Sequence, residues 1–281
     1  MKSIINFGGI LSHGIPDFRL DSDVLDKTIK SILNLGIETK YNQELGKDFT
    51  IQNLKEEFDA VFIGIGGNIP MQMNIEGENL EGVYGGNRLL EENMHPNYEG
   101  KKVAVIGGGN VAMDCARTII RKGAKEVYII YRRSEEQMPA EKKEIEEAKE
   151  DGIKFLFQNN IVKILPKENT NIVEKIECIK TELVQKDGET RLSPVDIKDS
   201  NYQIDIDYVI MAIGSKPEKQ VIDKLKIDVN QKGYIEVDEN YMTSEKGVFA
   251  GGDIIGKKAT VAWAASMGRD AAESIDKYLS K

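Results

Sequence analysis

The chain of 281 residues contains few of the residues that mark disulfide-rich or metal-binding proteins. Its two cysteines, Cys115 and Cys178, are too few and too far apart for a disulfide framework, a CxxC redox pair, or a zinc or iron–sulfur ligand set. We therefore predict no metal site, and any electron transfer by this chain requires an added cofactor. The two histidines lie in loop-like segments, and we assign no side chain to catalysis.

An excess of basic residues is also missing. Lys+Arg number 38 and Asp+Glu number 47, which gives a net charge of −9. Proteins that bind nucleic acid or anionic membranes usually carry a basic surface, so we expect neither partner here.

Long hydrophobic runs are absent as well. No segment approaches the roughly 18 consecutive apolar residues of a membrane span, and the first residues do not form a signal peptide. We expect a cytoplasmic protein. Hydrophobic residues make up 40% and charged residues 30%, as in globular proteins, and the length favours two domains.

The clearest pattern lies in the middle of the chain. Residues 101–106 read as a buried strand, residues 107–112 match G-x-G-x-x-[GA], a helix follows through Ile120, and residues 126–131 form a second strand. This strand-loop-helix-strand unit predicts a dinucleotide site; the alternative is a glycine-rich turn that binds nothing. The motif residues assigned to the cofactor are Gly107, Gly108, Gly109, Asn110, Val111 and Ala112.

Each small residue of this motif has a physical role. Gly107 permits the tight turn, Gly109 lets the backbone approach a pyrophosphate, and Ala112 lets the helix lie close to the sheet. The N–H groups at the start of the helix then face the anion.

The end of the second strand indicates which dinucleotide binds. An NAD site usually has an acidic residue there for the ribose 2′-hydroxyl, but this chain has Arg132 and Arg133. Two guanidinium groups suit a 2′-phosphate, so NADP(H) is favoured over NAD. The alternative is an exposed basic turn that faces the acidic helix at residues 135–150.

Other segments extend the unit. Residues 153–198 alternate apolar stretches and turns, which predicts an antiparallel meander, and residues 204–213 read as one further strand. Ligands lie beyond the carboxyl ends of such strands, so Ala212, Ile213 and Gly214 are expected beside the nicotinamide half. An ordinary glycine between strand and loop fits the spacing equally well.

The ends of the chain predict a second unit. Apolar residues from Val24 to Leu33 recur at helical spacing before Gly36, which predicts a helix. Residues 59–67 read as a strand with a glycine-rich end, and residues 68–100 as a loop-like connection. Residues 247–253 give a strand and a Gly-Gly-Asp turn before a helix that Thr260 caps. Taken alone, Asp253 is more typical of a simple turn residue than of a ligand.

Five motifs occur in a fixed order: GGIL at 8–11, GIPDFRL at 14–20, GGGNVAMD at 107–114, YRR at 131–133 and AGGD at 250–253. This order resembles the two-dinucleotide flavoprotein family of the glutamate synthase small subunit. The same core occurs in the flavin and NADPH domains of dihydropyrimidine dehydrogenase and in the large subunit of NADH-dependent ferredoxin:NADP oxidoreductase. The resemblance covers nearly the whole chain.

The resemblance implies an enzyme in which NADPH and FAD exchange hydride and iron–sulfur clusters carry the electrons onward. It also implies that Gly108 to Val111, Arg132, Arg133 and Ala212 to Gly214 hold NADPH. The resemblance further implies that FAD is lined by Gly8, Gly9, Leu11 and Arg19, that Asp253 bonds its ribityl chain, and that Thr260 and Val261 lie beside the flavin ring. The glycine turns at Gly66 and Gly252 are also assigned to the cofactor.

The expected fold is α/β with two Rossmann-like domains, in which residues 86–214 form an NADP-binding domain inserted in a partial FAD-binding domain of residues 1–85 and 215–281. Family members have an iron–sulfur domain and a first FAD-binding unit before the GG-x-L stretch, whereas only residues 1–7 precede Gly8 here. We therefore expect an iron–sulfur or flavin-domain partner to complete the FAD site. The alternative is an NADP(H)-binding module that has no turnover on its own.

Overall fold

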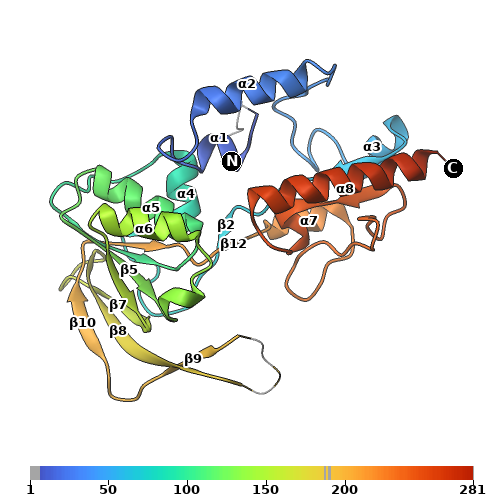
Figure 1. Ribbon diagram of the computed structural model, residues 1–281. Coiled ribbons are helices and arrows are strands. Elements are labelled where there is room, and N and C mark those ends of the chain that lie inside the picture. Colours follow the sequence, from blue (N-terminus) through green and yellow to red (C-terminus); the bar gives the residue numbers. More distant parts are fainter. Residues whose placement is uncertain (1–6, 187, 189–190, 281) are drawn as a thin grey trace. The chain divides into compact units, whose positions relative to one another are not determined.

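The computed structural model describes residues 7–186, 188 and 191–280 (Figure 1). The chain forms two units: a larger unit of residues 7–32 and 70–214, and a smaller unit of residues 33–69 and 215–280. Residues 7–32 and 70–85, which the sequence grouped with the flanking domain, are grouped with the larger unit by their contacts.

A parallel sheet of five strands forms the centre of the larger unit. Its order is β3-β11-β4-β5-β6, with β3 at Val83–Gly85, β11 at Tyr208–Met211, β4 at Lys102–Ile106, β5 at Glu126–Tyr131 and β6 at Lys154–Phe157. Helix α5 (Asn110–Arg121) connects β4 to β5, and η1 (Glu135–Gln137) and α6 (Lys142–Glu150) connect β5 to β6. The predicted strand-loop-helix-strand unit is confirmed by β4, α5 and β5, which follow one another in the chain. Strands β4 and β5 are parallel, and such a pair needs a crossover connection, which α5 supplies.

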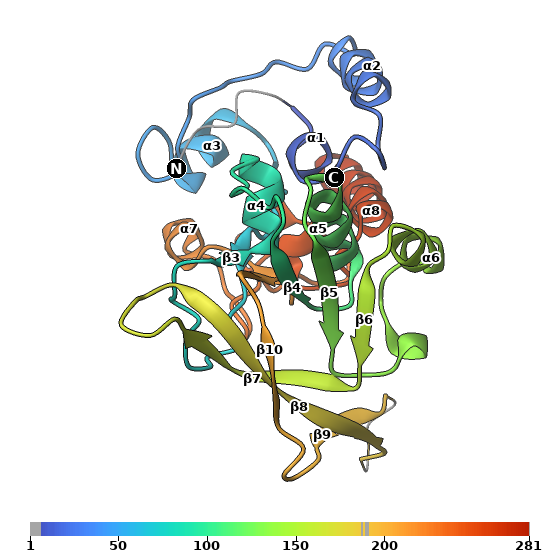
Figure 2. The same ribbon diagram turned by 90° about the vertical axis from the view of Figure 1, so that its left-hand side faces the viewer.

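The two faces of this sheet are covered differently (Figures 1 and 2). Val103 and Val105 of β4 pack with α5, α6 and α4 (Gly86–Glu92). Ala104 and Ile106 face the opposite side and pack with an antiparallel sheet. That sheet consists of β7 (Asn159–Pro166), β8 (Val173–Val184), β9 (Ser193–Asp196) and β10 (Tyr202–Asp205). Both faces are therefore buried, which explains the continuous apolar run in β4.

Three local predictions are corrected. The strand expected at residues 204–213 is divided between β10 and β11, which belong to different sheets, because Asp207 turns the chain: its Oδ2 accepts from Lys102 N (2.8 Å) and its Oδ1 from Lys101 Nζ (3.0 Å). Residues 154–157, expected in the meander, are the parallel strand β6. The connection at 68–100 contains β3 and α4, whose Leu89 and Leu90 are buried in the core.

Two helices precede the sheet. Helix α1 (Ile10–His13) packs against α4, and α2 (Ser22–Leu33) confirms the predicted amphipathic helix. No residue of α2 is buried.

The smaller unit contains a parallel pair of strands and three helices. Its elements are α3 (Ile51–Glu57), β1 (Val61–Ile63), α7 (Lys219–Leu225), β13 (Val248–Ala250), η2 (Gly252–Ile255) and α8 (Val261–Leu279). Strands β1 and β13 pair in parallel, and their side chains form one core with α7, η2 and Met267 of α8. Strands β2 (Ile69–Pro70) and β12 (Ser215–Lys216) also pair. Within the described residues, no helix combines the length and the apolar character needed to cross a membrane.

Candidate functional site

The loop after β4 brings the backbone very close to neighbouring elements. Gly107 has a φ of +139°, and a Cβ there would lie 2.2 Å from the carbonyl oxygen of Ala212. A Cβ on Gly108 would lie 2.6 Å from the ring of Tyr131. Any side chain at either position would clash, so the glycines are required by packing on two sides. This close packing brings the loop beside the ends of β5 and β11.

The loop leads directly into α5, whose N-cap is Gly109 and whose cap has no side-chain hydrogen bond. The first N–H groups of a helix lack partners one turn back; in α5 Ala112 N donates to Gly109 O (3.0 Å), whereas among the described residues the N–H groups of Asn110 and Val111 have no backbone acceptor and are available to an anion. Asn110 does not cap the helix, because its Oδ1 accepts from Glu141 N (3.0 Å). Ala112 is completely buried against the sheet, as the motif requires.

The chain after β5 folds back along this loop. Ala140 N donates to Gly108 O (3.1 Å), and the hydroxyl of Tyr131 donates to Gln137 O (2.8 Å). Tyr131, buried at 7% exposure, therefore supports Gly108 with its ring and the following segment with its hydroxyl. The sequence analysis did not assign this role to Tyr131, because an aromatic residue at the end of a strand is normal for any buried strand.

The two arginines lie where β5 ends. The backbone oxygen of Arg132 accepts from Thr181 Oγ1 (2.9 Å), and that of Arg133 accepts from Gln158 N (3.0 Å). The side chain of Arg132 is exposed, and Arg133 Nε donates to Leu192 O (3.2 Å). In the described part of the chain neither guanidinium forms an ion pair with the acidic helix α6, whose carboxylates pair with other cations.

The end of β11 reaches the same edge of the sheet. Ala212 N donates to Ile106 O (2.8 Å), which continues the pairing with β4 up to the glycine loop. Ile213 is half-buried, and Gly214 has a φ of +112° while its carbonyl accepts from Met71 N (3.0 Å). The predicted NADP(H) residues are thus neighbours along one edge of the sheet.

Gly8, Gly9 and Leu11, which the resemblance associated with FAD, lie in the larger unit at the start of α1. Gly8 has a φ of +108° and Gly9 a φ of +51°. Leu11 is half-buried, and its N–H donates to Gly8 O (3.0 Å). This tight glycine turn sets the direction of the short helix.

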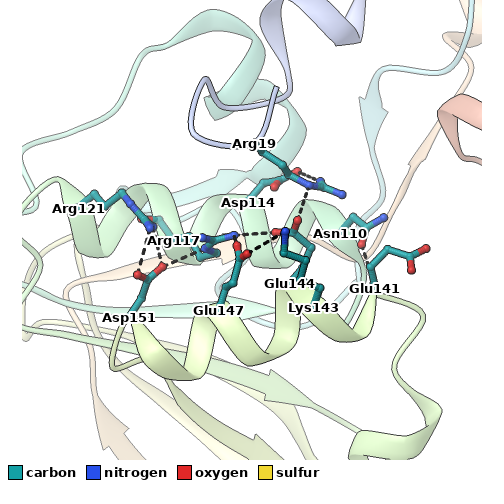
Figure 3. A network of polar contacts seen from close by, with 10 residues as sticks. All are labelled: Arg19, Asn110, Asp114, Arg117, Arg121, Glu141, Lys143, Glu144, Glu147 and Asp151. Carbon is teal, nitrogen blue, oxygen red and sulfur yellow. Dashed lines mark hydrogen bonds and ion pairs between the residues drawn. The ribbon is translucent and has the colours of Figure 1, made fainter. Parts of the chain in front are cut away.

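Arg19 belongs to a network of ion pairs in the larger unit (Figure 3). Its Nη1 lies 2.7 Å from Asp114 Oδ2 on α5, and its Nε lies 3.0 Å from Glu144 Oε1 on α6. Glu144 also accepts from Arg117 Nη1 (2.7 Å). The network continues through Glu147, Asp151 and Arg121. Arg19 therefore attaches the GIPDFRL segment to the helix that follows the glycine loop.

Asp114 is the most enclosed acid of this network, at 3% exposure, and its Oδ1 has no hydrogen-bond partner in the structure. Burial raises the pKa of its carboxyl to about 6, although Arg19 acts in the opposite direction. The sequence analysis assigned no chemistry to Asp114, and its pairing with Arg19 spans 95 residues. Only the arrangement of α5 beside residues 14–20 makes this pairing possible.

The remaining predicted FAD residues lie in the smaller unit. Gly66 (φ +66°) follows β1, and Gly252 (φ +79°) follows β13. Asp253 is half-buried, and burial raises the pKa of its carboxyl. Thr260 caps α8 by accepting from Trp263 N (3.4 Å), which confirms the predicted cap. Val261, the first residue of α8, is 49% exposed.

Comparison with known proteins identifies the family. A family model described as pyridine nucleotide-disulphide oxidoreductase matches residues 3–268. The chain belongs to this family. Solved structures with this fold include the His57Gln mutant of FprA from Mycobacterium tuberculosis, with a TM-score of 0.81 and 18% identity over 97% of this chain and 75% of that one. Thioredoxin reductase of T. acidophilum has a TM-score of 0.67 and 19% identity over 98% of this chain and 88% of that one. The predicted fold class is confirmed.

Curated relatives confirm the predicted resemblance within this family. The beta subunit of NADP(+)-dependent formate dehydrogenase of Moorella thermoacetica is 39% identical over 97% of this chain and 39% of its own length. The small chain of glutamate synthase [NADPH] of Escherichia coli (strain K12) is 34% identical over 97% of this chain and 61% of its own length. The chain thus spans about two fifths to three fifths of these relatives, which are named as a subunit and a small chain.

This member of the pyridine nucleotide-disulphide oxidoreductase family has no redox-active thiol pair. Cys115 on α5 and Cys178 on β8 are both free and buried. Burial raises the pKa of the Cys178 thiol to about 12 and also raises that of Cys115, so neither forms a reactive thiolate near neutral pH. In the described residues no group of three or more His, Cys, Asp or Glu side chains is placed to hold a metal ion.

Proposed function

We propose that this chain is the NADP(H)- and FAD-binding part of a cytoplasmic reductase that transfers hydride between NADP(H) and FAD. The observation that carries the proposal is the glycine loop after β4, packed against Ala212 and Tyr131, with two arginines at the end of β5. The carboxyl edge of the parallel sheet thus combines two features of an NADP(H) site. The glycine loop and the start of α5 can bind a pyrophosphate, and the two arginines can bind a 2′-phosphate.

The residues present fit NADP(H). Because Gly107 and Gly108 have no Cβ, the loop can pack directly against Ala212 and Tyr131. This tight turn would allow the free N–H groups of α5 to reach the pyrophosphate. Arg132 and Arg133 are held by their backbone oxygens; Arg132 is exposed, and Arg133 is half-buried with its Nε on Leu192 O. Ala212, Ile213 and Gly214 would border the nicotinamide half, beyond the carboxyl end of β11.

For FAD, the candidate residues are distributed over both units. Gly8, Gly9, Leu11 and Arg19 belong to the larger unit, and Gly66, Gly252, Asp253, Thr260 and Val261 to the smaller unit. When bound, the nicotinamide and the flavin supply the hydride chemistry, and the protein positions them and excludes side reactions. This is consistent with the lack of an assigned catalytic side chain.

A partner is part of the proposal. The relatives named above are subunits by name. We infer that an iron–sulfur or flavin-domain segment or subunit receives the electrons.

The nucleotide assignment is tested by equilibrium titration of the purified chain with NADPH and with NADH. Replacing Arg132 and Arg133 together by Ala should weaken NADPH binding by roughly 1.5–3 kcal/mol for each lost phosphate contact and leave NADH binding nearly unchanged. Arg88→Ala serves as the matched control, because Arg88 is exposed on α4 and is paired there with Glu92. Equal weakening of both nucleotides by the double change contradicts the 2′-phosphate assignment.

The flavin assignment is tested separately by the visible absorption spectrum under anaerobic conditions, first with added FAD and then with NADPH. Flavin bands that bleach with NADPH support a working reductase. If no flavin binds while NADPH still titrates, the chain is an NADP(H)-binding module whose FAD site needs the partner.

A further inference from the structure

A third arginine, distant in sequence, lies at the end of β5. Strands β8 and β9 form an antiparallel hairpin in which Val184 pairs with Ser193. Arg191 lies two residues before Ser193, the first residue of β9. Arg191 Nη2 donates to the hydroxyl of Tyr131 (3.0 Å) and also to Gln137 O. Tyr131 immediately precedes Arg132, so the hairpin brings this cation to the point where the 2′-phosphate is expected.

The position of the hairpin is fixed by contacts with the same two arginines. Leu192 O accepts from Arg133 Nε (3.2 Å), and Thr181 on β8 donates through Oγ1 to Arg132 O (2.9 Å). Thr181 is buried at 3% exposure. Both sides of the hairpin, at Thr181 and at Leu192, are therefore hydrogen-bonded to the arginine pair, and these bonds hold the neighbouring Arg191 near the end of β5.

Arg191 is also connected to the glycine loop. The ring of Tyr131 lies against Gly108, its hydroxyl accepts from Arg191, and the same hydroxyl donates to Gln137 O (2.8 Å). Only the side chain of Tyr131 thus separates Arg191 from Gly108, whose backbone is expected to lie beside the pyrophosphate.

The local charge favours an anion at this point. Glu135, in the segment that follows β5, is paired with Lys149 at 2.5 Å, so this lysine balances its charge. Arg132, Arg133 and Arg191 bring three positive charges to the end of β5.

We propose that Arg191 is a specificity residue that binds the 2′-phosphate of NADP(H) together with Arg132 and Arg133. The proposal rests on the proposed function, because it takes the dinucleotide site as given. A guanidinium presents N–H donors in a planar fork, so Arg191 can hold the Tyr131 hydroxyl while it donates to a phosphate oxygen.

The test compares Arg191→Gln and Arg191→Ala with the parent chain by titration with 2′,5′-ADP, 5′-AMP, NADPH and NADH. Gln removes the positive charge but keeps an N–H donor for the Tyr131 hydroxyl. It therefore distinguishes the effect of the charge on phosphate binding from the effect of the hydrogen bond to Tyr131. We expect both changes to weaken 2′,5′-ADP and NADPH on the order of tenfold, with little change for 5′-AMP and NADH. Arg88→Ala, which removes an exposed arginine paired with Glu92 on α4, is the control and should leave the ratio of NADPH to NADH affinity unchanged.

Two results would overturn the proposal, and they differ from each other. If the arginine pair variant loses NADPH preference but the Arg191 variants keep it, Arg191 only supports the loop and the NADP(H) site itself stands. If neither set of variants alters the preference, the 2′-phosphate assignment fails as a whole. Far-UV circular dichroism on each variant verifies folding, and because Arg191 is exposed we expect both variants to fold.

Discussion

Removal of the Arg19 charge tests the buried network between the GIPDFRL segment and α5. In Arg19→Met the side chain keeps most of its length but loses both ion pairs, to Asp114 and to Glu144. Glu144 retains Arg117, whereas Asp114, at 3% exposure, loses its ion-pair partner. Breaking a buried pair from one side typically costs about 3–5 kcal/mol, and since the Arg19 side chain is 20% exposed we expect about 3 kcal/mol at pH 7.5.

The pH dependence of this loss has a definite sign. The pKa of Asp114 is about 6 in the folded chain and 3.8 ordinarily, so the folded state holds the proton more tightly. The contribution of Asp114 to stability is therefore greatest below pH 3.8 and falls by about 3 kcal/mol as the pH rises to 6. Without Arg19 the folded pKa rises further, so the decline continues above pH 6. The difference in the free energy of unfolding between the parent chain and Arg19→Met should therefore increase above pH 6 and decrease below it.

The measurement is urea denaturation followed by far-UV circular dichroism at pH 5 and pH 7.5. Arg88→Met is the control, because its i,i+4 pair with Glu92 is exposed and should contribute less than about 1 kcal/mol. Asp114→Asn should remove most of the pH dependence. A loss below about 1 kcal/mol at pH 7.5, or an equal loss at both pH values, would refute this account of the network.

Two further predictions concern the glycine loop and the cysteines. Gly107→Ala would place a Cβ 2.2 Å from a carbonyl oxygen at a φ of +139°, so we expect a loss of about 2 kcal/mol or more in urea denaturation and no detectable NADPH binding; normal NADPH affinity would show that the loop does not hold the nucleotide. Cys115 and Cys178 are buried, so neither should react with a thiol reagent in the folded chain and both should react in denaturant; rapid reaction of the folded chain would contradict the structure.

Local patterns in the sequence were sufficient for the strand-loop-helix-strand unit. The strands at 102–106 and 126–131, the glycine loop and α5 follow from neighbouring residues, because short apolar runs, a glycine turn and a helical repeat each act over a few positions. The same holds for Thr260, whose cap bond reaches only three residues along the chain. The family resemblance was also readable, because its five motifs keep their order in the sequence.

Tertiary structure decided what depends on residues far apart. Asp207 ends one sheet and begins another through bonds to Lys101 and Lys102, a contact that no local pattern indicates. Arg19 was associated with a cofactor by resemblance, yet in this structure its charge is balanced by Asp114 and Glu144, 95 and 125 residues away. Arg191 gave no signal at all in the sequence. Long-range ion pairs and hairpin contacts form only when the fold brings their elements together, so their partners are determined by packing and not by spacing along the chain.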